Sequence, residues 1–185
     1  SIQCGNIYEI HDDAKYWLKQ SADSGHNWVV CLDEIGPANK GAMPDSFDPE
    51  HDTIRYKALW GNLMAGGAGV EWYFGYKYPN SDLSCEDWRS REKLWAQTKV
   101  AIDFFHKYLP FTEMKNADEL TKEKNDYCLA KEGEIYALYL PEGRSTNIIL
   151  PEGKYTVHWF NPRNGGDLLK GTIGSISGKT SATTG

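Results

Sequence analysis

The sequence predicts an α/β region that is the C-terminal part of a (β/α)8 TIM barrel, followed by an all-β region that is an antiparallel β-sandwich. Over residues 1–112, short apolar runs alternate with segments of helical periodicity, as in parallel sheets connected by helices. Over residues 126–185, short alternating runs are separated by Gly- and Pro-containing turns at the spacing typical of a sandwich. We expect residues 113–125 to connect the two regions.

The run from Trp28 to Gly36 predicts the central strand of the first region. It is rich in Val, is bounded by Gly25 and Gly36, and carries two adjacent acids, Asp33 and Glu34, near its end. A short apolar run between turn residues is typical of a strand buried in a parallel sheet. In an α/β barrel the chemistry takes place at the C-terminal ends of the strands, so these two acids are candidates for a functional site.

The other elements of the first region follow in chain order. We expect a strand ending at Gly5, a helix to about Ser24, a turn-rich loop over 35–51, and then a helix (52–64), a strand (68–74), a loop (75–86) and a long helix (87–108). Three strand–helix units are too few to close an eight-stranded barrel, so we expect only its last part. The chain opens at Ser1 within a strand-like segment, and we expect a preceding portion of the protein to be missing.

Composition excludes several classes of function. The net charge is -6 and Lys and Arg do not cluster, which argues against nucleic acid as a partner because phosphate contacts need clustered positive charge. Apolar runs are too short to span a membrane, so no membrane partner is expected. The 4 Cys form no Cys-x-x-Cys pair and the 5 His lack a metal-ligand spacing, so we expect no metal and no cofactor. Two disulfides or none are compatible with the cysteines, and Cys31 is expected to be a buried thiol.

Several segments together resemble a group of bacterial glycoside hydrolases. The resemblance is carried by Asp33-Glu-Ile-Gly36, by the run from Tyr56 to Tyr76 with its Gly-Gly-Ala-Gly-Val-Glu-Trp-Tyr motif, and by Asp87-Trp-Arg-Ser-Arg91. The later stretch from Tyr155 to Gly166, which contains Trp-Phe-Asn-Pro-Arg-Asn-Gly-Gly, resembles the C-terminal module of these proteins, labelled a "putative collagen-binding domain". The resemblance covers nearly the whole chain and implies a barrel of the retaining-glycosidase clan A type followed by a β-sandwich.

The resemblance also implies roles for individual residues. Glu34 matches the nucleophile of the clan, a glutamate in a Glu-x-Gly pattern at the end of the seventh strand. Trp72 matches the aromatic residue beneath the sugar ring at the end of the eighth strand. Retaining hydrolysis needs a second carboxyl about 5–5.5 Å from the first. The clan carries that acid/base glutamate on the fourth strand, ahead of the residues present, so activity of this portion alone is not expected.

Further substrate-binding residues are predicted beside Glu34 and Trp72, namely Asp33, Glu71, Tyr73, Tyr76 and Tyr78. Glu71 and Trp72 point to opposite faces of a strand, so only one of them can face the site unless the strand bends. Each assignment has a structural alternative. Glu34 is then an acid paired with an arginine such as Arg55, Asp33 a cap or ion pair, Trp72 a core residue, and the tyrosines ordinary loop aromatics.

The remaining charged residues of the two loops predict structural roles. The first loop lacks the regular spacing of a calcium loop and is expected to be a solvated acidic segment, with Asp45, Asp48, His51 and Asp52. The second is expected to hold a salt-bridge network and a helix cap, with Asp82, Glu86, Asp87, Arg89 and Arg91. In the β-region, Asn161 to Gly166 predicts a turn, and Trp159 and Phe160 are expected to point to opposite faces.

Two function hypotheses follow. The first is a retaining O-glycosidase acting on a poly- or oligosaccharide, with Glu34 as nucleophile. The alternative is a non-catalytic module that binds carbohydrate or a matrix protein, with the β-region contacting extracellular matrix or polysaccharide. A collagen-degrading protease is disfavoured because the sequence shows neither a metal signature nor a nucleophile triad. The resemblance further implies a secreted or periplasmic location.

Overall fold

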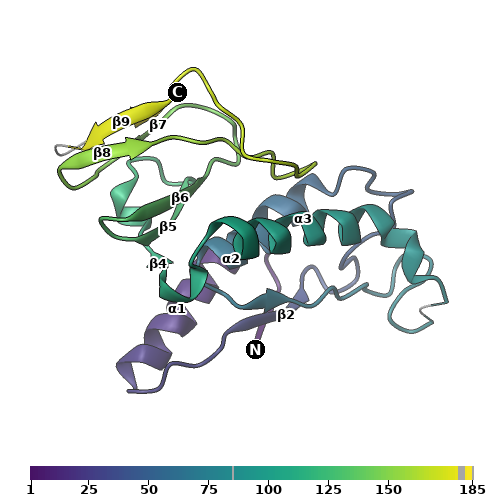
Figure 1. Ribbon diagram of the computed structural model, residues 1–185. Helices are drawn as coiled ribbons and strands as arrows, with labels where there is room; N and C mark the ends of the chain where they lie inside the picture. The colour runs from purple at the N-terminus through teal and green to yellow at the C-terminus, as the bar shows by residue number, and fades with distance from the viewer. Residues whose placement is uncertain (85, 179–181, 185) are drawn as a thin grey trace. The chain divides into compact units, whose positions relative to one another are not determined.

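The computed structural model describes residues 1–84, 86–178 and 182–184. The chain divides into an N-terminal unit, Ser1–Ala101, and a C-terminal unit, Ile102–Gly185. Each unit is described by itself, with its elements labelled as in Figure 1. The division falls inside a long helix, and the domain boundaries predicted after residues 112 and 125 stay predictions.

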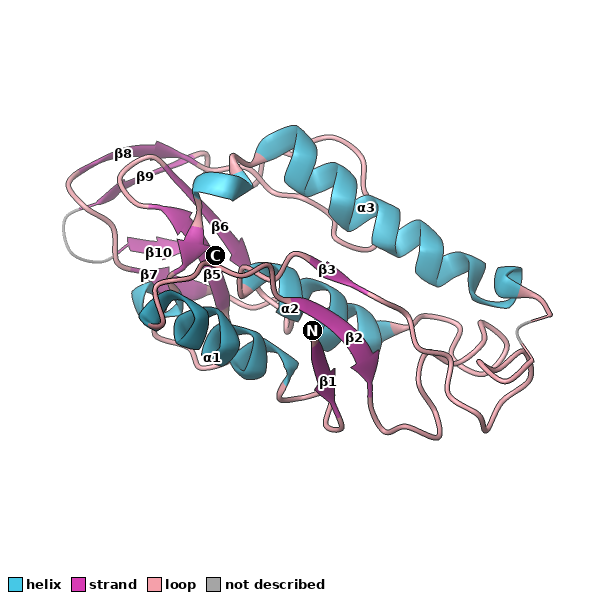
Figure 2. Ribbon diagram, turned by 90° about the horizontal axis from the view of Figure 1, so that it is seen from below, coloured by secondary structure: helices cyan, strands magenta, loops and turns pink. Residues whose placement is uncertain are grey.

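The N-terminal unit contains a small parallel sheet. Its strands β1 (Ile2–Cys4), β2 (Cys31–Ile35) and β3 (Gly69–Val70) are hydrogen-bonded in the order β1-β2-β3. Both neighbouring pairs are parallel, and Figure 2 shows the three strands side by side. The helices along this part of the chain are α1 (Ile10–Asp23), the π-helix η1 (Ile54–Trp60), α2 (Gly61–Met64), the 3-10 helix η2 (Trp88–Arg91) and α3 (Glu92–Tyr108).

Local sequence explains where these helices begin and end. Gly25 has a φ of 81°, a conformation that favours glycine, and it follows the end of α1 as expected. The Asp87 side chain accepts a 3.1 Å hydrogen bond from the backbone N–H of Arg89 and caps η2, which runs directly into α3. The cap predicted at Asp87 is therefore confirmed.

The C-terminal unit contains three small antiparallel sheets. One has the order β4-β5-β6, a second pairs β8 with β9, and a third pairs β7 with β10. Two short 3-10 helices precede the longer strands, η3 (Phe111–Glu113) and η4 (Asp118–Leu120). The strands are β4 (Lys115–Asn116), β5 (Tyr127–Lys131), β6 (Ile135–Tyr139), β7 (Thr146–Ile148), β8 (Gly153–Thr156), β9 (Ser175–Gly178) and β10 (Ala182–Thr184).

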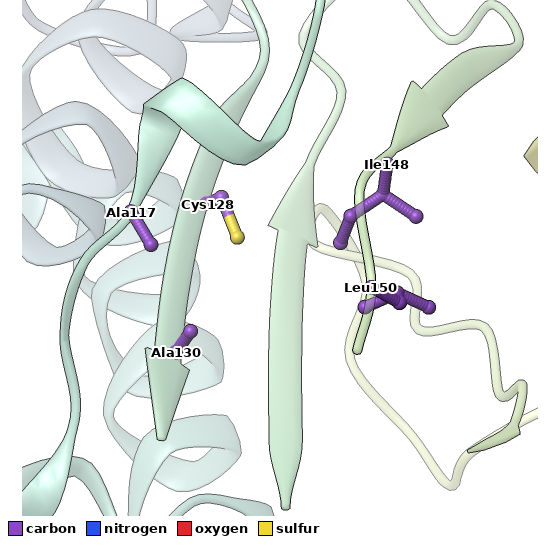
Figure 3. Packing of buried hydrophobic residues seen from close by; sticks show 5 residues of the cluster. All are labelled: Ala117, Cys128, Ala130, Ile148 and Leu150. Carbon is purple, nitrogen blue, oxygen red and sulfur yellow. The ribbon is translucent and has the colours of Figure 1, made fainter. Parts of the chain in front are cut away.

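A cluster of buried side chains lies between the strands of this unit. Alternate residues of β5, Cys128 and Ala130, face Ile148 and Leu150, as Figure 3 shows. Partly buried apolar side chains complete the cluster, namely Leu120, Tyr136, Leu138, Tyr155 and Ile176. Alternation along β5 thus gives this unit a small apolar core.

The predicted fold class, a barrel portion followed by a β-sandwich, is wrong. The described residues form a small α/β fold, with a few helices, one three-stranded parallel sheet and antiparallel sheets of two or three strands. The local pattern of strands and helices is present, but the strands pair over too few residues to form those larger sheets. The predicted strand at 68–74 joins the sheet only through Gly69 and Val70.

The central strand is also shorter than its sequence pattern predicted. We expected it to begin at Trp28, yet β2 begins at Cys31. Trp28 and Val29 are 65% and 74% exposed, so the start of the apolar run lies at the surface rather than in a sheet. An apolar run indicates that a segment is able to be buried, and the tertiary partners decide whether it is.

The cysteines of the described residues are thiols. Cys4 and Cys128 are buried, and Cys31, which we expected to be buried, is half-buried. Burial raises the pKa of Cys4 to about 11, and the hydrogen bond that its Sγ donates to Asp13 raises it further. Cys85 lies outside the described residues. Within the described ranges, the helices are too short or too polar to cross a membrane.

Candidate functional site

The predicted catalytic residue lies at the C-terminal end of β2. Glu34 is paired with Gln3 of β1, and its side chain is exposed, whereas Asp33 is half-buried. Arg55, the partner considered for Glu34, pairs instead with Asp52 and donates a 2.9 Å hydrogen bond to the carbonyl of residue 50. Glu34 is thus open to solvent at the edge where the site was predicted.

Tyr73 brings further polar groups to this edge. Partial burial raises the pKa of the Tyr73 hydroxyl, and the nearby carboxylates of Asp82 and Glu34, followed by Tyr76, raise it further. We call Glu34, Tyr73, Tyr76 and Asp82 the strand-end cluster. Asp82 also accepts a 2.8 Å hydrogen bond from the backbone N–H of Phe74. We expected only a structural role for Asp82 from the sequence, and its place in this cluster was missed.

Trp72 faces away from the strand-end cluster. It is 7% exposed, and its indole N–H donates a 2.9 Å hydrogen bond to Thr98 Oγ1 on α3. Phe74, two residues on, lies on the same side and packs against Trp95, with the ring centroids 5.9 Å apart. Glu71, which directly follows β3, is exposed. Alternation along the extended chain therefore gives Trp72 the geometry of a core residue, and its sugar-stacking role stays a prediction.

Tyr78 belongs to a different contact. Its ring lies 4.8 Å from that of Phe47 in the preceding loop, and the Lys77 ammonium lies 5.5 Å from the Tyr78 centroid. The electrostatic influences on Tyr73 group it with Tyr76 and Glu34, whereas Tyr78, on the same loop as Tyr76, packs against Phe47 of the preceding loop. The substrate-binding and catalytic roles predicted for these residues remain predictions.

Arg91 fastens the two loops of the N-terminal unit. Its guanidinium is fully buried and donates hydrogen bonds to the carbonyl oxygens of Ala42 (2.9 Å) and Asn80 (2.8 Å). It also lies 4.1 Å from the ring centroid of Phe74. We expected Arg91 in a salt-bridge network between the loop and the helix, and its burial among carbonyls was not foreseen. These long-range partners leave no local signal in the sequence.

His51 fixes the first loop. Its Nε2 lies 2.7 Å from Asp45 Oδ1, and its Nδ1 lies 3.8 Å from Asp48 Oδ2. Asp45 Oδ2 accepts a 3.1 Å hydrogen bond from the backbone N–H of Lys93, at the start of α3. The acids of this loop therefore hold protein groups rather than water alone. Across the described residues, three His, Cys, Asp or Glu side chains nowhere converge to hold a metal ion.

A second candidate region is the hairpin of the C-terminal unit formed by residues 159–169, which we call the 159–169 hairpin. Trp159 and Leu169 face each other and exchange two backbone hydrogen bonds of 2.9 and 2.7 Å. The Asn161 side chain accepts hydrogen bonds of 3.0 Å from the backbone N–H groups of Arg163 and Asn164. Gly165 and Gly166, with φ of 70° and 100°, complete the turn expected from the sequence.

Two contacts attach this hairpin to the end of α3. The Phe160 ring lies 4.5 Å from the ring of Phe104, and Lys107 Nζ lies 2.7 Å from Asp167 Oδ1. The hydrogen bond from Lys107 lowers the pKa of Asp167, and the same contact raises the pKa of Lys107. Phe160 thus packs against aromatic rings of α3, and the neighbouring Trp159 is half-exposed.

The comparisons with known proteins concern this second region. Residues 114–184 match the model of a family described as "Putative collagen-binding domain of a collagenase". No curated protein and no solved structure matches the chain. The resemblance of the C-terminal module is therefore confirmed for that domain, which includes the 159–169 hairpin. The comparisons give no support to the glycoside hydrolase part of the resemblance.

Proposed function

We propose that the C-terminal unit is a non-catalytic module that binds a matrix protein of the collagen type. The observation that carries this proposal is the match of residues 114–184 to a family described as collagen-binding. It corresponds to the alternative hypothesis from the sequence. The glycoside hydrolase hypothesis depended on the barrel, which the structure contradicts.

The chemistry of collagen is compatible with this unit. Collagen winds three polyproline II chains, whose carbonyl groups make no hydrogen bonds within their own chain and whose surface is rich in proline rings. Proteins recognise polyproline II segments with aromatic and apolar side chains and a few hydrogen-bond donors. The C-terminal unit exposes such apolar side chains, including Leu169 (56%), Ile149 (39%) and Phe111 (38%).

The balance of charge supports the same kind of ligand. Residues 114–184 contain equal numbers of basic and acidic side chains, so the whole net charge of -6 falls on residues 1–113. A neutral module does not depend on long-range attraction to a highly charged polymer. Because matrix proteins are extracellular, the proposed function also implies a secreted or periplasmic location.

Direct binding measurements test the proposal. The full chain is titrated over immobilised triple-helical collagen, heat-denatured collagen, an uncharged polysaccharide and serum albumin. Saturable binding to collagen that exceeds binding to albumin is expected. Binding to the polysaccharide alone would favour the carbohydrate alternative, and binding to none of the surfaces would overturn the proposal.

A further inference from the structure

The five-membered ring of Trp159 lies close to Gly171, in a position that depends on this residue being glycine. A Cβ atom built on Gly171 would stand 2.0 Å from Trp159 Nε1 and 2.4 Å from its Cδ1, far inside van der Waals contact. The pairing of Trp159 with Leu169 fixes the backbone beneath the ring. The indole is therefore held in place at the surface by backbone on one side and stays half-exposed on the other.

The indole N–H of Trp159 is unused. In the part of the chain that the structure describes, it donates no hydrogen bond, whereas the N–H groups of Trp72 and Trp95 donate to Thr98 and to the carbonyl of Trp88. Because Trp159 is half-exposed, its N–H is able to donate to water or to a ligand. Leu169, 56% exposed, adds an apolar side chain directly across the hairpin.

We propose that Trp159 and Leu169 form the contact surface for one polyproline II strand of the matrix protein. The ring face of Trp159 packs against a proline ring, and its N–H donates to a carbonyl of the strand, since such a strand offers carbonyls free of internal hydrogen bonds. Phe160 and Asp167 act as positioning residues, because they hold the hairpin without facing the ligand. This inference rests on the proposed function and names the surface that performs it.

Substitutions separate the ring from its N–H. Trp159→Ala is expected to lower the affinity for triple-helical collagen by about tenfold or more, as for a buried aromatic anchor at an interface. Trp159→Phe keeps a ring but removes the donor, and a loss of about three- to tenfold is expected. Leu169→Ala is expected to cost a few-fold. Matched controls in the N-terminal unit are Trp17→Ala, at a position 48% exposed, and Leu83→Ala, at 86%; both are expected to bind collagen like the parent.

A second measurement observes binding by the parent protein itself and needs a variant only to assign one signal. The 7 Trp indole N–H signals are followed by NMR in the full chain, with the Trp159 signal assigned from Trp159→Phe. Adding a triple-helical Pro-Pro-Gly repeat peptide should shift the Trp159 signal and leave that of Trp72 in place. Collagen binding by the parent together with unchanged binding by Trp159→Ala and an unmoved Trp159 signal would refute this inference. Absence of collagen binding by the parent would instead refute the proposed function.

Discussion

Two tryptophans that follow strands, Trp72 in the N-terminal unit and Trp159 in the C-terminal unit, are used in opposite ways. Trp72 is 7% exposed, and its indole N–H donates a hydrogen bond to Thr98 Oγ1. Trp159 is half-exposed, and within the described residues its N–H has no acceptor. The resemblance made Trp72 a candidate for sugar binding, whereas for Trp159 the sequence predicted only the opposite face from Phe160. Burial and the state of the N–H group distinguish a packing residue from one that is available to a ligand.

The largest effect expected from this comparison is on stability. Trp72→Ala removes a buried indole and its hydrogen bond, and it should lower the free energy of unfolding by about 3–5 kcal/mol. Trp159→Ala removes a half-exposed ring and should cost clearly less. Urea denaturation of both variants measures the difference. The comparison fails if the two substitutions destabilise the protein equally.

A pair of leucines in the C-terminal unit sharpens the contrast between core and surface. Leu150 is 2% exposed in the core of Figure 3, and Leu150→Ala should lower the free energy of unfolding by about 2–5 kcal/mol. Leu169, 56% exposed, should change it by no more than about 0.5 kcal/mol when replaced by Ala. Thermal unfolding of the two variants checks this ranking. A larger loss for Leu169→Ala would mean that its side chain serves packing.

The strand-end cluster provides a test on the other unit. Because neighbouring carboxylates raise the pKa of Tyr73, replacing either one should bring that pKa down toward its ordinary value. Asp82→Asn should lower it more than Glu34→Gln, since Asp82 is the stronger of the two influences. NMR titration of labelled tyrosine measures both shifts. Glu34→Gln should also leave collagen binding unchanged, and a marked loss would mean that the N-terminal unit takes part in binding.

The smallest expected effect concerns the ion pair that attaches the hairpin. The pKa of Asp167 lies below its ordinary value of 3.8, so the pair stabilises the folded hairpin above that value. The contribution is lost as the pH falls through the lowered pKa. The hydrogen-exchange protection factors of the Trp159 and Leu169 amides, which account for the slower intrinsic exchange in acid, should therefore fall at strongly acidic pH. Asp167→Asn should show the lower protection factors already at neutral pH, and added salt should narrow the difference between the parent and this variant because the pair is exposed.

Local signals in the sequence were enough to locate several elements. The cap at Asp87, the glycine after α1 and the turn beginning at Asn161 each depend on one to four neighbouring residues, and each is present in the structure. These features follow from backbone conformation and short-range hydrogen bonds, which the types of the neighbouring residues determine. The C-terminal module was also recognisable from its own motif.

Contacts between residues far apart in the chain could not be predicted from the sequence. Alternation showed that Glu71 and Trp72 face opposite ways, but not which of them faces α3. The carbonyls that bind Arg91 come from residues 42 and 80, and the glycine beneath Trp159 lies at 171. The fold class failed for the same reason, because strand signals say where a strand can form and not how far it pairs with its neighbours.

The close approach of Gly171 to Trp159 has a consequence for evolution. Because a Cβ at 171 would overlap the indole, the two positions are not free to vary independently. A homologue that carries alanine or a larger residue at the position of Gly171 should carry a smaller side chain in place of Trp159. The residues at positions 159 and 171 therefore form a two-position signature. It distinguishes related sequences that keep the half-exposed indole from those in which a smaller side chain replaces it.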